Sequence, residues 1–75
     1  MKQWNEVICE LRMDHDLKQS DLAQLLKTTQ QVYSRYERGI NEIPIHHLKT
    51  LCEFYGVSAD YVLGICVNEN RSENK

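Results

Sequence analysis

The chain has 75 residues and a formal net charge of −2 at pH 7, from nine basic and eleven acidic side chains. From this length we expect a single domain with one small core and no separate effector domain. The N-terminal residues do not read as a signal peptide, and no stretch approaches the roughly 20 apolar residues of a membrane span, so we expect a cytoplasmic protein.

A first amphipathic helix is predicted over residues 3–14. Its apolar positions follow the i, i+3, i+4, i+7 spacing of one helix face, and they are Trp4, Val7, Ile8 and Leu11. This stripe should face the segment that follows. His15, near the end of the helix, should complement the negative end of the helix dipole.

A short second helix and a break are predicted between residues 17 and 29. One face of this helix is apolar, and its members are Leu17, Leu22, Ala23, Leu25 and Leu26. The run Lys27-Thr28-Thr29 interrupts the pattern. Thr29 is suited to cap a new helix by accepting a backbone N–H from two or three residues ahead.

The third helix should start near Gln30 and end at Gly39, because glycine readily adopts the left-handed conformation that closes a helix. Tyr33 and Tyr36 fall on one side of it. The opposite side carries hydrogen-bonding groups and is poor in carboxylates; its residues are Gln30, Gln31, Ser34 and Arg35.

Glutamine and arginine side chains have a specific use at DNA. Glutamine can pair with adenine N7 and N6, and arginine with guanine O6 and N7, each good pair giving roughly 1–3 kcal/mol of discrimination. Two adjacent glutamines on an arbitrary helix are more often solvated surface. Here the two glutamines lie at the capped start of a helix, and this position favours a role in recognising base edges.

Two further helices complete the predicted fold. Pro44 suits the first position of a fourth helix, which should run to Gly56. Its apolar positions are Ile45, Leu48, Leu51, Cys52 and Tyr55. Ser58 can cap a short fifth helix that ends at Gly64. We therefore expect a domain over residues 1–66 and a polar, flexible tail over residues 67–75.

Five stretches resemble the helix-turn-helix regulators of the Cro and phage-repressor type, also called the xenobiotic-response-element type. They are Leu11-Arg12, LKQSDLAQL (17–25), TTQQ (28–31), SRYERG (34–39) and GVSADYVLG (56–64). Their order and separations are more specific than any single stretch. The resemblance implies an all-α, compact five-helix domain, like that of the lambda repressor, which binds double-stranded DNA and regulates transcription, most simply as a repressor.

The resemblance also implies roles for individual residues. Gln19 corresponds to a glutamine that contacts a DNA phosphate and braces the recognition helix. Gln30, Gln31 and Arg35 stand where family members read bases, and Thr29 stands where they contact the DNA backbone. The full set of expected DNA-binding residues is Lys18, Gln19, Lys27, Thr29, Gln30, Gln31, Ser34, Arg35 and Arg38.

Arg12 and Glu37 resemble a pair that forms a structural salt bridge between the first helix and the end of the recognition helix. Lys18 and Lys27 depart from the family pattern, because a small capping residue and a glycine usually stand there. Both changes should lower stability. Both also add positive charge beside the proposed DNA face, so they are either phosphate contacts or solvated surface lysines.

Charge is unevenly distributed along the chain. Residues 17–39 carry a net +2, which leaves −4 for the remaining residues. A whole-chain charge of −2 argues against nucleic-acid binding, whereas the concentration of positive charge in the motif favours it. The loop over residues 40–43 is not basic, unlike that of many phage repressors, so we expect no minor-groove arm.

No metal, disulfide or small-molecule cofactor is predicted. Cys9, Cys52 and Cys66 are widely spaced without a Cys-x-x-Cys pair, and the first two are expected as buried apolar thiols. His46 and His47 are adjacent, so on a helix they diverge by about 100° and cannot readily share a metal. Solvated surface is the stronger interpretation of both.

Regulators of this kind usually bind as dimers on half-sites about one DNA turn apart. We expect a homodimer with Val57, Tyr61 and Ile65 at its interface; the alternative is that these residues complete the monomer core. The second functional class is a protein-interaction module, antitoxin-like or adaptor, which the acidic net charge and the loop favour. No nucleophile–base pair, carboxylate pair or phosphate-binding loop supports an enzyme.

Overall fold

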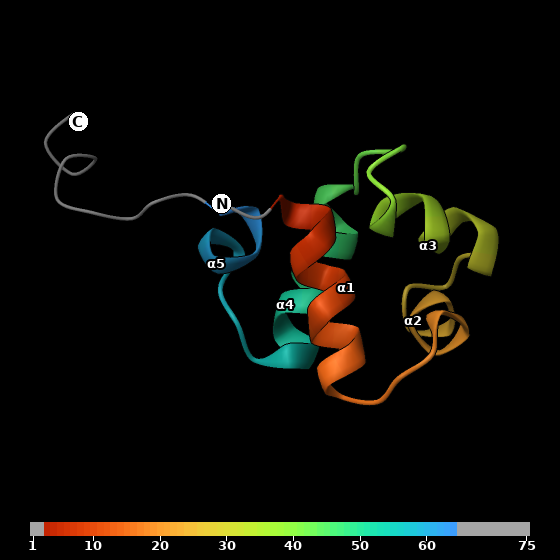
Figure 1. The fold of residues 1–75 in the computed structure, drawn as a ribbon, viewed down its shortest axis with the longest axis horizontal. Coiled ribbons are helices and arrows are strands. Elements are labelled where there is room, and N and C mark those ends of the chain that lie inside the picture. The colour runs from red at the N-terminus through yellow and green to blue at the C-terminus, as the bar shows by residue number, and fades with distance from the viewer. Residues whose placement is uncertain (1–2, 65–75) are drawn as a thin grey trace, which may run out of the picture.

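The structure, a computed structural model, describes residues 3–64, and this part of the chain forms five helices without a strand. They are α1 (Trp4–Asp14), α2 (Gln19–Leu25), α3 (Gln30–Glu37), α4 (Ile45–Tyr55) and α5 (Ala59–Leu63). Figure 1 shows α2 and α3 at one end of the domain and α5 at the other, with α1 and α4 between them. The predicted all-α, five-helix class is confirmed. Among residues 3–64, no helix has the length and apolar character needed to cross a membrane.

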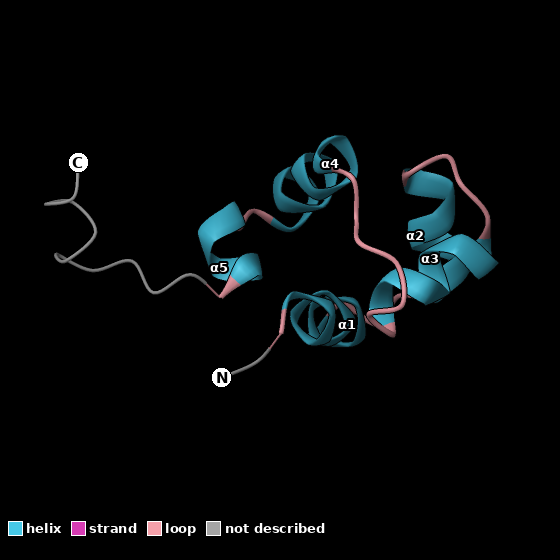
Figure 2. Cartoon of the chain, turned by 90° about the horizontal axis from the view of Figure 1, so that it is seen from above, coloured by secondary structure: helices cyan, strands magenta, loops and turns pink. Residues whose placement is uncertain are grey.

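One hydrophobic core joins all five helices. α2 packs on α3, α1 packs on both α3 and α5, and α4 packs on α5, an arrangement that Figure 2 shows from above. The buried hydrophobic side chains are Val7, Ile8, Leu11, Leu22, Ala23, Leu26, Tyr33, Tyr36, Leu48, Leu51, Cys52 and Val62. The predicted stripes of the first two helices therefore face the core, with Trp4, Leu17 and Leu25 packed at its edge.

The ends of α1 follow from local hydrogen bonds. At its start, the Gln3 N–H donates to Oε1 of Glu6 at 3.0 Å. At its end, Nδ1 of His15 lies 2.8 Å from the carbonyl oxygen of Leu11. Because a carbonyl oxygen can only accept, the His15 ring donates this hydrogen bond. His15 lies at the C-terminus of the helix, as predicted from the sequence.

The start of α4 differs from the prediction by one residue. Pro44 is the N-cap and not the first helical residue, because its ψ of 151° is extended. Its carbonyl accepts from the N–H groups of His47 and Leu48, so the helix begins at Ile45. At that first position no other element covers Ile45, which is 82% exposed instead of continuing the buried stripe.

The predicted limits of α5 are confirmed. Oγ of Ser58 accepts from the Tyr61 N–H at 3.1 Å, and Gly64 ends the helix with a φ of +71°. Gly56 ends α4 in the same left-handed conformation. The predicted polar tail and the domain boundary at residue 66 lie outside the described residues.

Candidate functional site

A tight turn joins α2 to α3 and sets their relative orientation. Lys27 adopts a φ of +59°, the left-handed conformation expected where relatives carry glycine. For a non-glycine residue this conformation costs about 1–2 kcal/mol. Two residues later, Oγ1 of Thr29 accepts from the Val32 N–H at 3.1 Å, so Thr29 is the N-cap of α3 as predicted.

α3 has two faces of opposite character. Tyr33 and Tyr36 point into the core, 0% and 5% exposed, and their rings meet edge to face. Gln30, Gln31 and Arg35 are exposed on the other side. Because aromatic packing holds the inner face, the polar side chains project from a fixed helix and not from a mobile loop.

The polar face of α3 lines a recess of about 330 Å³ together with the start of α2. The residues around this recess, which we call the polar recess, are Gln19, Gln30, Gln31, Ser34, Arg35 and Arg38. All six were expected from the sequence as DNA-binding residues, and none carries a carboxylate. Glutamine amides and arginine guanidinium groups can therefore donate and accept hydrogen bonds side by side on one surface.

The other three expected DNA-binding residues lie outside the polar recess. Lys18 is the exposed N-cap of α2, while Lys27 and Thr29 are exposed in the turn before α3. Lys18 lacks an acceptor atom, so its side chain cannot cap. Its backbone N–H instead donates to Oδ2 of Asp21 at 2.9 Å, and this bond offsets part of the expected loss.

A buried ion pair connects the C-terminal end of α3 to α1. Glu37, the last residue of α3, is 8% exposed, and its Oε2 accepts from Nε of Arg12 at 2.7 Å. Nη2 of Arg12 reaches Oε1 at 3.2 Å, and Nη1 donates to the carbonyl oxygen of Leu17 at 2.9 Å. The predicted salt bridge between α1 and the end of α3 is therefore present, in the two-point geometry that favours arginine.

Gln19 links this ion pair to the polar recess. Its Nε2 donates to Oε1 of Glu37 at 3.0 Å, which is the bracing contact that the sequence implied. Burial raises the pKa of Glu37, but the hydrogen bonds from Arg12 and Gln19 and the nearby Tyr33 hydroxyl outweigh this and hold the pKa below its ordinary value. The Tyr33 hydroxyl approaches the carboxylate without the geometry of a formed hydrogen bond, and burial raises the pKa of Tyr33.

Sequence reasoning missed one contact at the same place. Nδ2 of Asn5, on α1, donates to the backbone carbonyl oxygen of Glu37 at 3.1 Å. The two residues are 32 positions apart, and the acceptor is a backbone atom, so no residue pattern signals this bond.

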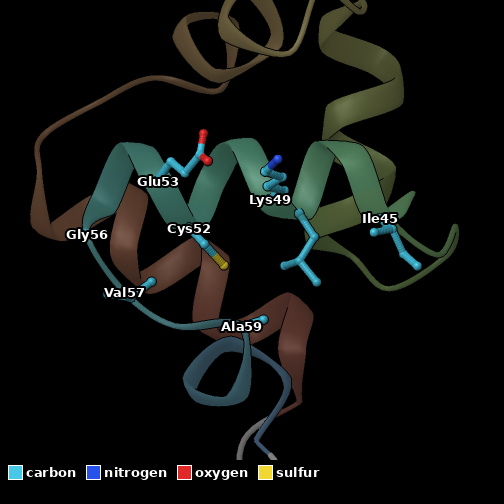
Figure 3. Close-up of a pocket in the computed structure, with 8 residues that line it drawn as sticks. Ile45, Lys49, Cys52, Glu53, Gly56, Val57 and Ala59 are labelled. Carbon is cyan, nitrogen blue, oxygen red and sulfur yellow. The ribbon is translucent and has the colours of Figure 1, made fainter.

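The expected dimer residues have unequal surroundings. Val57 is partly buried against the core, and it lines an apolar groove of about 280 Å³ between α4 and α5, shown in Figure 3. Tyr61 is 58% exposed on α5. Ile65 lies outside the described residues. The alternative, that these residues complete the monomer core, therefore holds in part for Val57 and does not hold for Tyr61.

The thiols and imidazoles depart in detail from expectation. Cys52 is buried as expected, but Cys9 is only partly buried, because it lies at the edge of α1 beside the charged Arg12. Cys66 lies outside the described residues. The rings of His46 and His47 are 4.2 Å apart, closer than their helical divergence suggests. Within residues 3–64, no cluster of three or more His, Cys, Asp or Glu is placed to hold a metal.

Comparisons with known proteins agree with this geometry. The helix-turn-helix family model matches residues 9–62. A transcriptional regulator from Listeria innocua is similar over 96% of this chain and 70% of its own, with 24% identity and a TM-score of 0.81. The P22 c2 repressor, solved with a synthetic operator, is similar over 84% of this chain and 96% of its own, with 24% identity and a TM-score of 0.77. No curated protein sequence matches the chain.

Proposed function

Since the chain belongs to the helix-turn-helix family, we propose that it is a sequence-specific regulator of transcription that binds double-stranded DNA by placing α3 in the major groove. It acts as a repressor in the cytoplasm, without an enzymatic activity or a cofactor. The P22 c2 repressor, which has the same fold and was solved with a synthetic operator, supports this proposal.

One observation carries the proposal: Gln30, Gln31 and Arg35 are exposed together on a helix whose opposite face is locked into the core. A major groove about 12 Å wide admits one α-helix, and its base edges present acceptors and donors to match. Glutamine matches adenine, and arginine matches guanine. Ser34 adds a hydroxyl to the same surface.

The remaining residues position α3 on the phosphate backbone. Lys18, Lys27 and Arg38 are exposed cations, and Arg38 lines the polar recess. Gln19 and Thr29 present an amide and a hydroxyl at the two helix starts. Contacts of this kind to the DNA backbone fix the position of the protein along the duplex but do not distinguish one base sequence from another. With few cations available, the slope of log K against log salt should be modest, about −0.9 for each phosphate neutralised.

The protein binds its site as a homodimer through the surface of α5, with Val57, Tyr61 and Ile65 as interface residues. The exposed Tyr61 on α5 and the apolar groove that Val57 lines support this part of the proposal. Sedimentation velocity at several protein concentrations, with and without DNA, tests it. A mass that rises toward two chains is expected, whereas one chain per particle throughout would remove the dimer.

The second candidate function is a protein-interaction module, antitoxin-like or adaptor, with weak or no DNA binding. The net charge of −2 and the absence of basic residues from the loop over residues 40–43 favour it. The two candidates differ in what they require of the polar recess, because a protein partner does not require base-matching amides there.

Selection of bound sequences from a pool of random duplexes tests the proposed function. Enrichment of a short palindromic site is expected, since two copies of α3 would read two related half-sites. Recovery of sequences no different from the starting pool would refute sequence-specific binding and leave the interaction module.

A further inference from the structure

The C-terminal end of α3 is held by an asparagine that the family resemblance does not assign. The last four carbonyl groups of a helix have no partner inside it. In α3, the carbonyl of Ser34 accepts from the Arg38 N–H, that of Arg35 from Ile40 and Asn41, and that of Tyr36 from Gly39. The fourth, that of Glu37, accepts from Nδ2 of Asn5.

Gly39 gives Asn5 the space to make this bond. A Cβ placed on Gly39 would lie 3.1 Å from Nδ2 and 3.2 Å from Cγ of Asn5. Gly39 also has a φ of +75°, which disfavours any residue with a side chain. A glycine here therefore serves both the helix end and the approach of the asparagine amide.

Two contacts along α1 grip the same residue of α3. Asn5, in the first turn of α1, binds the backbone of Glu37, while Arg12, two helical turns later, binds its carboxylate. Residues seven positions apart lie on one helix face. Figures 1 and 2 both show the C-terminal end of α3 meeting α1. In addition to the core packing of Tyr33 and Tyr36, these two separated contacts therefore hold the end of α3 against α1 at two points.

We propose that Asn5 is a positioning residue for base recognition: it sets the angle between α1 and α3, and so the placement of Arg35 in the DNA groove and of Arg38 at the phosphate backbone. These two arginines lie in the last turn of α3 and directly after it, next to the contact. Gln30 and Gln31 lie at the opposite end, where the Thr29 cap holds the helix. Loss of the Asn5 amide should therefore weaken base recognition by Arg35 more than base recognition by Gln30 and Gln31.

This inference rests on the proposed DNA binding, and the experiment separates the two. Sequence selection is carried out on the wild type, Asn5→Ala, Asn5→Asp and Ile8→Val, all at a temperature at which each is folded. Ile8→Val is the control, because it removes one methylene from a fully buried position on the same helix and leaves the amide intact. Asn5→Asp keeps the shape, removes the donor and places negative charge at a helix C-terminus.

A well-placed arginine should prefer its base over the other bases by roughly tenfold. At the base pair read by Arg35, we expect this preference to fall to about twofold in Asn5→Ala and to a lower value in Asn5→Asp. Preference at the pairs read by Gln30 and Gln31 should persist, and Ile8→Val should keep the wild-type pattern. Amide exchange without DNA should quicken at Arg38 and Ile40 in the Asn5 variants only.

Equal weakening at every base pair, or the same pattern in Asn5→Ala and Ile8→Val, would overturn the positioning role while leaving DNA recognition in place. A wild type that selects no sequence would refute the proposed function, and the positioning role with it.

Discussion

The guanidinium of Arg12 and the carboxylate of Glu37 form the only ion pair that the described residues place almost entirely out of solvent, with side chains 16% and 4% exposed. This pair joins the end of α1 to the end of α3, and Gln19 binds the same carboxylate from α2. Three helices thus meet at one charged residue. Removing either partner leaves a buried charge without compensation, whereas removing both does not.

We predict that Arg12→Met or Glu37→Gln lowers the free energy of unfolding by about 3 kcal/mol, because one buried charge loses its partner. The double variant should lose clearly less than the two single losses added together. Urea unfolding of the four proteins measures these differences. Losses that simply add would show that the two side chains act independently.

The acidity of Glu37 predicts a pH dependence. Its pKa in the folded protein lies below the ordinary value of 4.5, so the carboxylate stabilises the fold fully above that value. The stabilisation is lost as the pH falls from about 4.5 through the folded pKa. The difference in unfolding free energy between the wild type and Glu37→Gln should therefore stay constant from pH 7 to about 5 and shrink below about 4. A difference that grows on acidification would contradict this assignment.

Two variants of Lys27 separate its strain from its charge. Lys27→Gly removes the cost of the positive φ and should raise the unfolding free energy by about 1 kcal/mol, while Lys27→Ala retains the strain. If Lys27 contacts a phosphate, both variants should bind all DNA sequences more weakly and reduce the salt slope by about 1. Unchanged binding in both would make Lys27 a solvated surface residue.

Substitution of Thr29, the N-cap of α3, should lower stability without changing the core. Thr29→Ala removes the acceptor of the Val32 N–H and should cost about 1 kcal/mol, whereas Thr29→Ser keeps the acceptor and should cost much less. Thermal unfolding compares the two. Equal loss in both variants would mean that the Thr29 methyl group, and not its hydroxyl, stabilises the helix start.

Local patterns predicted most of the fold. The stripes of α1 and α2, the Thr29 and Ser58 caps and the glycine stops depend on neighbours within one or two helical turns, so the sequence reports them directly. Pro44 was misplaced by one residue, because its fixed φ suits both the N-cap and the first helical position. Its ψ of 151°, which the proline ring does not fix, decides between them.

Contacts between distant segments were predicted only where a family resemblance supplied them. The Arg12–Glu37 pair and the bracing role of Gln19 came from that resemblance. Asn5 had no such precedent, and its partner is a carbonyl group that every residue possesses. The partial exposure of Cys9 likewise depends on where α1 lies against its neighbours, which apolar spacing alone does not fix.

We propose that Gln30, Gln31 and Arg35 read bases, while the surrounding cations contact only the phosphate backbone. Binding of the wild type, Gln30→Ala, Gln31→Ala and Arg38→Ala to the selected site and to single-base variants of it tests this directly. Each glutamine variant should lose discrimination at its own base pair, by roughly tenfold, and remain folded. Arg38→Ala should weaken binding to every duplex alike. Glutamine variants that keep the full wild-type preference would contradict base reading by Gln30 and Gln31.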